Sequence, residues 1–253
     1  MVKTLLRKIL NYFSFFKISN EDYILFRKHY KYLLYAEFKN SKQSINLNEE
    51  LLKNSKSQLI QDLIVVDYFN FKKNGVFVEL GASDGVELSN THLLEKSFEW
   101  EGVLIEPVKS SFKKLEKNRD GICLNKVIYN KKSSIIFQED IIPELSTIKD
   151  YTNSDINKRV KKTEYEIETL TLNNIFNEIL KTNYIDFLSL DTEGSEFIIL
   201  SDLDHNKYRF GFICVEHNFS KNRKKIYELL ITNGYRRIYE RYSKWDDYYI
   251  PIQ

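Results

Sequence analysis

The chain has too few cysteines to be held together by disulfide bonds. Only Cys123 and Cys214 are present among its 253 residues, and each lies within an apolar run, GICLN and FICVE. A buried thiol is the ordinary state of such a cysteine. Because no disulfide framework is present, the composition favours a reducing compartment, and we expect a cytoplasmic protein.

Long apolar runs and an excess of charge of one sign are also missing. No stretch reaches the roughly 18 apolar residues that a transmembrane helix needs. Lys and Arg number 38 and Asp and Glu 36, which leaves a net charge of +2. A polyanion binder needs a concentrated basic surface, so nucleic acid is not an expected partner. The hydrophobic fraction of 42% is ample for a packed core, and the length fits one α/β domain.

The N-terminal stretch VKTLLRKILNYFSFF, residues 2–16, predicts an amphipathic helix. Lys3, Arg7 and Asn11 share one face, whereas apolar residues recur at helical spacing on the other: Leu5, Leu6, Ile9, Leu10, Phe13 and Phe16. No small-residue cleavage site follows, so the stretch is not a signal peptide. We expect it to dock on its own domain or on a second subunit as a homodimer contact. The alternative is peripheral contact with the inner face of a membrane.

Two regions follow from the pattern along the chain: an N-terminal helical extension, 1–56, and an α/β domain, 57–253. In the second region, five apolar runs alternate with helical patterns: VFVEL, GVLIEP, GICLNKVIY, YIDFLSLD and FGFICVEHN. This alternation predicts a parallel sheet with helices on both faces. The last two runs, YRRIYERYS and DDYYIPI, predict a terminal antiparallel hairpin. Residues 130–165 lack periodicity and are expected to form an insertion or a mobile loop, a lid over the site.

Acidic and amide residues follow the predicted strands. In parallel α/β sheets, ligands bind at the carboxyl ends of the strands, where the strand order reverses. All five strand ends of this chain carry such residues: Glu79–Gly85, Glu106, Asn125, Asp191–Glu193 and Glu216–Asn218. The sequence therefore predicts a ligand site at this edge of the sheet.

The glycine turn in VFVELGASDGVELSN indicates which cofactor binds there. Gly81 and Gly85 are spaced G-x-x-x-G, and not G-x-G-x-x-G as in dinucleotide-binding folds. Glu79 and Asp84 would repel a phosphate, whereas S-adenosylmethionine brings an ammonium, a sulfonium and a ribose. Glu106 lies 21 residues after Gly85, where a carboxylate can accept hydrogen bonds from both ribose hydroxyls. NAD would also use that acid, so Glu106 alone does not discriminate.

The joint pattern S-Q-x-x-Q-D, G-A-S-D-G, I-E-P and S-L-D-T-E-G resembles the FkbM family of S-adenosylmethionine-dependent methyltransferases. The resemblance implies a Rossmann-like class I methyltransferase fold with a seven-stranded, mostly parallel sheet. It also implies O-methylation of a sugar or natural-product hydroxyl. Ser83 and Thr192 depart from the family pattern, where Asn and Val are usual, but both are small. The candidate cofactor-binding residues are Glu79, Gly81, Ala82, Ser83, Asp84, Asn90, Glu106, Pro107, Asn125, Val127 and Asp191, with Gln58 and Asp62 from a preceding helix.

Methylation of an alcohol requires a group that takes its proton, or a metal ion. His217 ends the fifth predicted strand, and we expect it to act as the base, with Asp191 and Glu193 orienting the acceptor. Asp191, Glu193 and Glu216 could together hold Mg²⁺ through oxygen ligands, although no metal-specific spacing indicates this. The alternative for Glu193 is to cap the next helix. Gln58, Gln61 and Asp62 form either a polar stripe beside the cofactor or a solvated helix face.

The sequence thus predicts an O-methyltransferase that acts on a sugar or glycan precursor. Two alternatives stay open. The acceptor could be a small-molecule or lipid-linked alcohol, or the fold could serve as a non-catalytic scaffold. Glu79, Gly81, Asp84, Glu106 and Asp191 are all present, which speaks against the scaffold.

Overall fold

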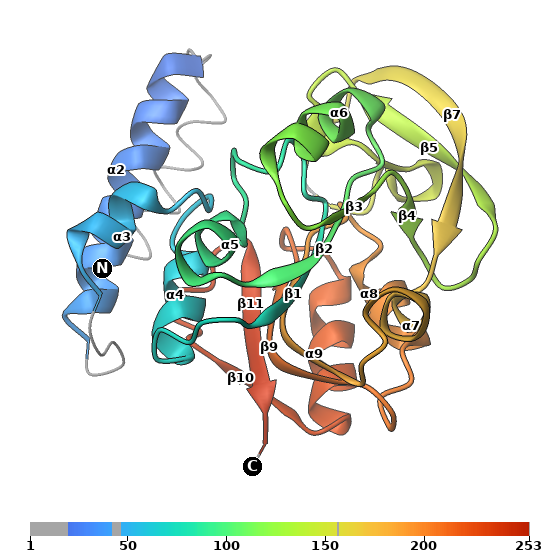
Figure 1. The fold of residues 1–253 in the computed structure, drawn as a ribbon. Coiled ribbons are helices and arrows are strands. Elements are labelled where there is room, and N and C mark those ends of the chain that lie inside the picture. Colours follow the sequence, from blue (N-terminus) through green and yellow to red (C-terminus); the bar gives the residue numbers. More distant parts are fainter. Residues whose placement is uncertain (1–19, 42–46, 156, 253) are drawn as a thin grey trace.

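The computed structural model describes residues 20–41, 47–155 and 157–252 (Figure 1). The helix predicted over residues 2–16 lies outside these ranges. Within them, no helix combines the length and the apolar character that crossing a bilayer would require.

A seven-stranded sheet forms the centre of the molecule (Figure 1). Its strand order is β10-β11-β9-β8-β1-β2-β3. All neighbours from β9 to β3 run parallel, whereas β11 is antiparallel to both β9 and β10. The predicted class I methyltransferase fold, with its terminal antiparallel hairpin, is therefore confirmed. The strands are β1 Val76–Leu80, β2 Glu101–Ile105, β3 Ile122–Leu124, β8 Tyr184–Leu190, β9 Arg209–Glu216, β10 Tyr235–Ile238 and β11 Asp246–Pro251.

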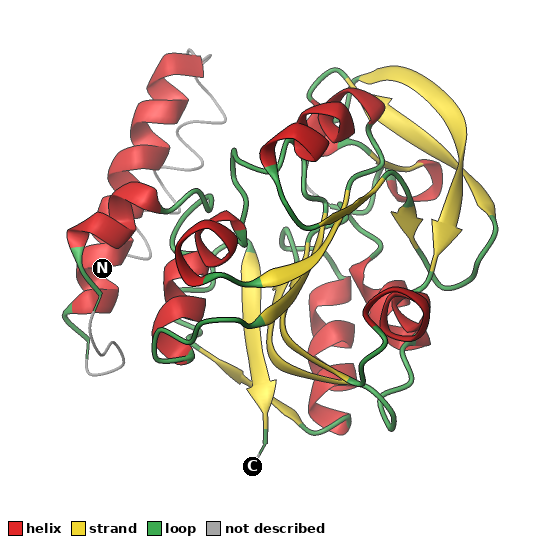
Figure 2. Cartoon of the chain, viewed as in Figure 1, coloured by secondary structure: helices red, strands yellow, loops and turns green. Residues whose placement is uncertain are grey.

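Helices cover both faces of this sheet, as Figure 2 shows. One face packs against α2 Asn20–Lys39, α3 Glu49–Asn54, α4 Gln61–Tyr68, α5 His92–Phe98 and α6 Lys109–Asn118. The other packs against α7 Leu172–Asn174, the π-helical turn η3 Ile175–Leu180, α8 Glu196–Asp202 and α9 Asn222–Thr232.

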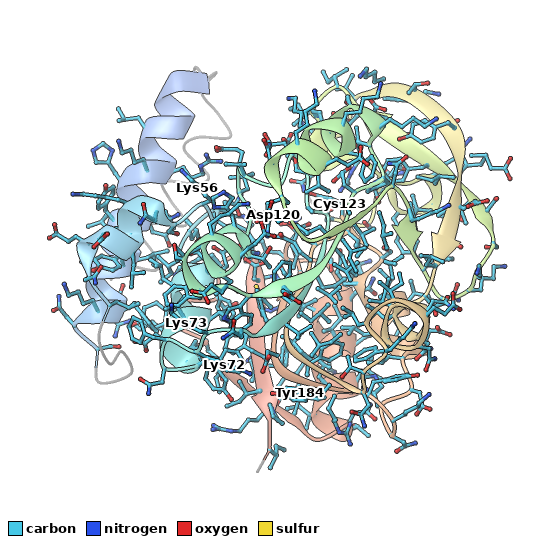
Figure 3. The ribbon with its side chains drawn as sticks, viewed as in Figure 1. Lys56, Lys72, Lys73, Asp120, Cys123 and Tyr184 are labelled. Carbon is cyan, nitrogen blue, oxygen red and sulfur yellow. The ribbon has the colours of Figure 1, made fainter. Side chains whose placement is uncertain are left out.

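Alternation along the strands explains why both faces are apolar. Side chains of successive strand residues point to opposite faces, so an unbroken apolar run serves two cores. Phe77, Phe187 and Phe212 join the core under α2–α6, whereas their neighbours Val78 and Leu188 join the core under α7–α9. Side chains fill the space between the layers (Figure 3). Burial of apolar area of this kind stabilises a fold by about 25 cal/mol per Å².

The strand order reverses between β1 and β8. From β1 the chain builds outward through β2 and β3, and it then returns to place β8 on the other side of β1. Lys72 and Tyr184, labelled in Figure 3, lie where β1 and β8 begin, at the amino ends of the strands. The carboxyl ends lie at the opposite edge, and the crevice expected at a reversal point opens there.

The segment 130–165, expected as an insertion or a mobile loop, contains regular strands. It belongs to a second, four-stranded sheet of order β4-β7-β5-β6 with a small core of its own, formed by Val108, Val127, Phe137, Ile148 and Ile167. Figure 1 shows β5 and β7 beside α6, apart from the large sheet. The elements are β4 Val127–Ile128, β5 Ser134–Asp140, the 3₁₀ turns η1 Pro143–Leu145 and η2 Lys149–Tyr151, β6 Thr147–Ile148 and β7 Lys161–Leu170.

Two boundaries differ from the sequence-based expectation. The run GICLNKVIY does not form one strand, because β3 stays in the large sheet and β4 pairs with β7 in the small one. The helix expected over residues 55–75 begins only at Gln61 and ends at Tyr68, so Gln58 does not share a helix face with Gln61 and Asp62. Ser57 instead forms an isolated bridge to Leu88, beyond the glycine loop.

Candidate active site

A cavity of about 570 Å³ lies at the carboxyl ends of β1, β2, β8 and β9. Its volume falls within the range of small-molecule sites, roughly 300–1,000 Å³. The second sheet covers it through residues 142–146, and α2 contributes Arg27. Of the predicted residues, ten line the cavity: Gln58, Glu79, Gly81, Ala82, Ser83, Asn90, Glu106, Pro107, Val127 and Asp191. Glu193 and Glu216 line it as well.

The glycine turn is shaped by close contact between β1 and β8. Gly81 has φ +79°, and a Cβ placed there would lie 2.0 Å from the backbone oxygen of Asp191. Only glycine fits this position. Asp84, predicted to bind the cofactor, does not line the cavity; its Oδ1 accepts hydrogen bonds from the N–H groups of Val86 and Glu87, both at 2.9 Å. Its role in the structure is to close the turn.

The carboxylate of Glu79 is already occupied by protein donors. It accepts hydrogen bonds from the Asn90 N–H at 2.7 Å and from the hydroxyls of Ser89 and Thr91, at 3.0 and 2.5 Å. Arg119 lies 3.5 Å away in the same buried group. The expectation that Glu79 meets the cationic end of the cofactor is therefore not supported. Its carboxylate instead holds the chain at residues 89–91.

Asn90 has the free acceptor that Glu79 lacks. Its Nδ2 donates to the hydroxyl of Ser189 at 3.0 Å, which fixes the amide. Its Oδ1 is buried and accepts no hydrogen bond from the described residues. A buried acceptor without a donor is costly, about 1–3 kcal/mol, and invites a ligand that donates.

Glu106 ends β2 and is buried under the glycine turn. Its two oxygens accept hydrogen bonds from the N–H groups of Ser83 and Val108, at 2.8 and 2.6 Å. Burial raises the pKa of Glu106 to about 8, and the nearby charges of Glu144 and Asp191 add to the effect. The predicted Asn125 does not line the cavity. It donates to the carbonyls of Glu106 and Pro107 and so positions this turn.

Asp191, Glu193 and Glu216 form a carboxylate cluster at the ends of β8 and β9. One oxygen of each lies within 4.8 Å of the others. Burial raises the pKa of Asp191 to about 7, and neighbouring carboxylates add to the rise. Burial and the Asp191 charge raise the pKa of Glu193 to about 9, more than Arg159 lowers it. Burial and the charges of Asp191 and Glu193 raise the pKa of Glu216 well above its usual value.

His217 does not line the cavity. Glu216 does, and successive residues at a strand end point to opposite sides. The His217 ring is buried: Nδ1 accepts from the Phe219 N–H at 3.1 Å, and Nε2 lies 3.4 Å from the Ser243 hydroxyl. Burial lowers the pKa of His217 to about 4, although Asp247 opposes the shift. The expectation that His217 takes the acceptor proton is not supported by this geometry.

The two other predicted polar residues have different surroundings. Gln61 lines the cavity and donates to Asp246 at 2.8 Å, tying α4 to β11. Asp62 faces away from the cavity and accepts from the hydroxyls of Ser55 and Ser57, both at 2.6 Å. The chain entering α4 is thereby anchored by Asp62, which has no access to a ligand.

Sequence reasoning missed several residues of this site. Arg27 reaches the cavity from α2 and pairs with Glu87 at 2.5 Å. Arg159 pairs with Glu193 at 2.5 Å, and Asn157 donates to the same oxygen at 3.2 Å. Arg159 and Asn157 come from the segment 130–165, which has no periodic pattern that could have indicated them. Ser189, two residues before Asp191, could have been found from the alternation of β8.

Comparison with known proteins gives one family match. The model of the methyltransferase FkbM domain matches residues 79–242. No curated protein matches the chain.

Several solved structures of methyltransferases are similar to the chain at low identity. A methyltransferase FkbM from Methylobacillus flagellatus is 14% identical, with a TM-score of 0.42, over 71% of this chain and 44% of that one. The chain therefore spans less than half of that protein. A methyltransferase from Pyrococcus furiosus is 16% identical, with a TM-score of 0.42, over 92% of this chain and 98% of that one. A precorrin-6y C5,15-methyltransferase from Geobacter metallireducens is 11% identical, with a TM-score of 0.40, over 85% and 93%.

Proposed function

Because the chain belongs to the FkbM family of methyltransferases, we propose that it transfers a methyl group from S-adenosylmethionine to a hydroxyl of a sugar or glycan precursor. The observation that carries this proposal is the cavity where the strand order reverses between β1 and β8. It is lined by the glycine turn at Gly81, the buried carboxyl group of Glu106 and Asn90, whose Oδ1 accepts no hydrogen bond from the described residues. Each of the three fits one part of that cofactor.

The residues of the cavity fit S-adenosylmethionine better than a dinucleotide. Glu106 would accept hydrogen bonds from the ribose hydroxyls, and Gly81 leaves room for the ligand to approach the backbone. Asn90 Oδ1 would accept from the ammonium group. A pyrophosphate would instead face the carboxylates of Glu106, Glu144 and Asp191, all of which line the cavity.

The cofactor supplies an electrophilic methyl group on its sulfonium. The chain's part is to hold the acceptor oxygen beside that methyl group and to keep bulk water away. Asp191 and Glu216 line the cavity, where they would orient acceptor hydroxyls, and an ionised carboxylate of this pair would take the proton that the hydroxyl loses as the new C–O bond forms and the C–S bond breaks. The second sheet closes over them through Pro143, Leu145 and Ile148, which are apolar and exclude water.

A lipid-linked or otherwise apolar alcohol is the second candidate acceptor. Ile141, Ile142 and Val160 are more than half exposed, at 59%, 51% and 55%. Ile142 lines the cavity, and the N–H of Ile141 donates to the carbonyl of Val160 at 3.0 Å. Ile142 therefore offers exposed apolar surface at the cavity for the hydrocarbon part of such a molecule, and the backbones of Ile141 and Val160 are adjacent to it.

Two measurements test the proposal. Calorimetry should show binding of S-adenosylmethionine in preference to NAD, which would use the same ribose acceptor. No heat with S-adenosylmethionine would favour the scaffold alternative. Mass spectrometry of cell-surface glycans and lipid-linked sugars, with and without the gene, should then reveal the loss of one methylene mass from the acceptor. A loss confined to the lipid-linked fraction would select the second candidate.

A further inference from the structure

The carboxylate cluster of Asp191, Glu193 and Glu216 lacks a cation of its own. In the described part of the chain, neither Asp191 nor Glu216 forms an ion pair with a lysine or an arginine. Arg159 pairs with Glu193, but its guanidinium also pairs with Asp155 at 2.7 Å, so its single positive charge is matched there. No lysine or arginine of the described residues thus compensates Asp191 or Glu216, which hydrogen-bond to each other instead, and the pKa of each is raised. Burying a carboxylate without a partner costs several kcal/mol.

Asn218 gives a second and independent sign of a ligand at this place. It follows β9 two residues after Glu216 and lines the same cavity. Its side chain is only 6% exposed in total, yet its amide makes no hydrogen bond with the described residues. Buried amides are normally paired, and the amide atoms of Asn218 are open to the cavity that the residue lines. The Asn218 amide oxygen is therefore available as a neutral ligand atom in the cavity that the three carboxyl groups also line.

The spacing of the cluster matches a cation with oxygen ligands. Oxygens bound to a divalent cation at about 2.1–2.4 Å lie roughly 3.0–4.8 Å from one another. The nearest carboxylate oxygens of Asp191, Glu193 and Glu216 lie within 4.8 Å of one another, so little rearrangement is needed. Carboxylate and carbonyl oxygens select Mg²⁺, Ca²⁺ or Mn²⁺ over softer metals.

The hydrogen bonds around Glu193 fit a ligand role. Its Oε2 accepts from Arg159 and Asn157, whereas its Oε1 accepts no hydrogen bond from the described residues. The backbone at Glu193 has φ +57°, a left-handed conformation that is uncommon for a residue with a side chain. Strain of this kind is typical of functional sites, where it aims a side chain. Outer partners that orient a metal-binding carboxylate are a usual part of metal centres.

We propose that Asp191, Glu193, Glu216 and Asn218 bind a divalent cation, Mg²⁺ or Mn²⁺, whose remaining coordination positions hold two adjacent oxygens of the acceptor. This deepens the proposed function, on which its acceptor part rests, while cation binding does not depend on it. The acceptor class that fits is a vicinal diol, as sugars offer. Asp191 also touches the glycine turn, so the cation lies beside the cofactor half of the cavity.

Mn²⁺ binding to the full-length, chelator-stripped chain tests the site, by calorimetry and by the electron paramagnetic resonance of free Mn²⁺. The wild type should bind one Mn²⁺ per chain. Glu216→Gln and Asp191→Asn should each weaken binding at least tenfold. Glu144→Gln is the matched control, because it removes the same charge from the same cavity but outside the cluster. That control should bind Mn²⁺ within twofold of the wild type.

Three outcomes would overturn the proposal. They are a wild type that binds no Mn²⁺, cluster variants that bind like the wild type, and a control that loses binding as strongly as they do. Circular dichroism checks that each variant is folded. Asn218→Ala, the mildest change, is a second test and should weaken Mn²⁺ binding at least threefold. In a methylation assay, a chelator should lower the rate at least tenfold and Mg²⁺ should restore it. A chelator-insensitive rate would refute the acceptor part alone.

Failure of the proposed function would look different. S-adenosylmethionine binding is measured on the metal-free chain, in a separate titration. Loss of that binding with Mn²⁺ binding retained would reject the methyltransferase proposal and leave the cation site standing. Retained cofactor binding without any Mn²⁺ binding would reject the cation site and leave the methyltransferase proposal standing.

Discussion

Replacing Glu106 with Gln should make cofactor affinity weaker and should change how it depends on pH. Burial raises the pKa of Glu106 to about 8 in the free protein. At pH 7 only about a tenth of the molecules would then carry the ionised group, which is the form that accepts ribose hydroxyls best. Binding must first remove the proton, so affinity should rise as the pH rises from 7 to 9.

The size of the effect follows from the hydrogen bonds of Glu106. Both of its oxygens accept from backbone N–H groups, of Ser83 and Val108, and each has a lone pair left for the ribose. A glutamine has only one oxygen, and its NH₂ group would face one of those N–H donors. Losing a charged acceptor costs about 1.5–3 kcal/mol, which is roughly 10- to 150-fold in Kd at pH 9.

Calorimetry at pH 6.5, 7, 8 and 9 measures this, with both proteins titrated in the same buffers. The ratio of the Gln-variant Kd to the wild-type Kd cancels the titration of the cofactor's own ammonium group. That ratio should grow about tenfold from pH 7 to pH 9, because the wild type alone gains an ionised acceptor. A ratio that stays constant would refute the raised pKa of Glu106. A ratio near one throughout would remove Glu106 from the cofactor site.

A stability measurement checks the same shift without any ligand. The pKa of Glu106 is higher in the folded protein than in the unfolded chain, where 4.5 is the usual value. The folded state therefore binds the proton more tightly, and the free energy of unfolding should fall as the pH rises from about 4.5 to about 8. Glu106→Gln should flatten that part of the stability curve, and an unchanged curve would contradict the assignment.

Three further predictions test other parts of the structure. Gly81→Ala should abolish cofactor binding and lower Tm by several degrees, since its Cβ would lie 2.0 Å from the Asp191 carbonyl oxygen. A binding titration and differential scanning calorimetry measure these two effects, and an unaffected variant would show that the turn can open. Arg159→Gln should raise hydrogen exchange of the amides in 147–155 and 157–160, because it loses the ion pair with Glu193 that holds this segment on the site and the ion pair with Asp155 within the segment. Unchanged exchange would mean that the hydroxyls of Thr147 and Ser154, which donate to the Glu193 carbonyl, hold it alone. Deleting residues 2–16 should leave cofactor binding intact but reduce dimerisation or liposome co-sedimentation, and a deletion that alters neither would assign the segment to its own domain.

Most of the fold could be predicted from the pattern of apolar residues along the strands. Runs such as VFVEL and FGFICVE are apolar except for one glutamate near the strand end, because both faces of a parallel sheet are buried, and this pattern could be read without a structure. Glycine spacing and acidic strand ends located the cavity for a similar reason. The carboxyl ends of parallel strands meet at one edge whatever the helices between them do. Glu106, Asp191 and Glu216 were found in this way.

Which face a side chain takes was not readable at the strand ends. Glu216 and His217 are neighbours in sequence, and only the register of β9 decides that Glu216 meets the cavity and His217 is buried. Glu79 and Asn90 were both expected to bind the cofactor, and the structure separates their roles for a comparable reason. Donors from residues 89–91 and Arg119, brought together by the fold, occupy the carboxylate and leave the amide oxygen free.

The sequence by itself determined the sheet, its hairpin, the glycine turn and the acidic edge, because these depend on local periodicity and on residue types near each strand. Tertiary structure alone decided that 130–165 forms a second sheet and brings Arg159 and Asn157 to Glu193. It also decided that Asp191 and Glu216, 25 positions apart in the chain, lie together and pair with no lysine or arginine of the described residues. Long-range contacts of this kind depend on how elements dock and carry no periodic signal in the chain, so only the folded structure could reveal them.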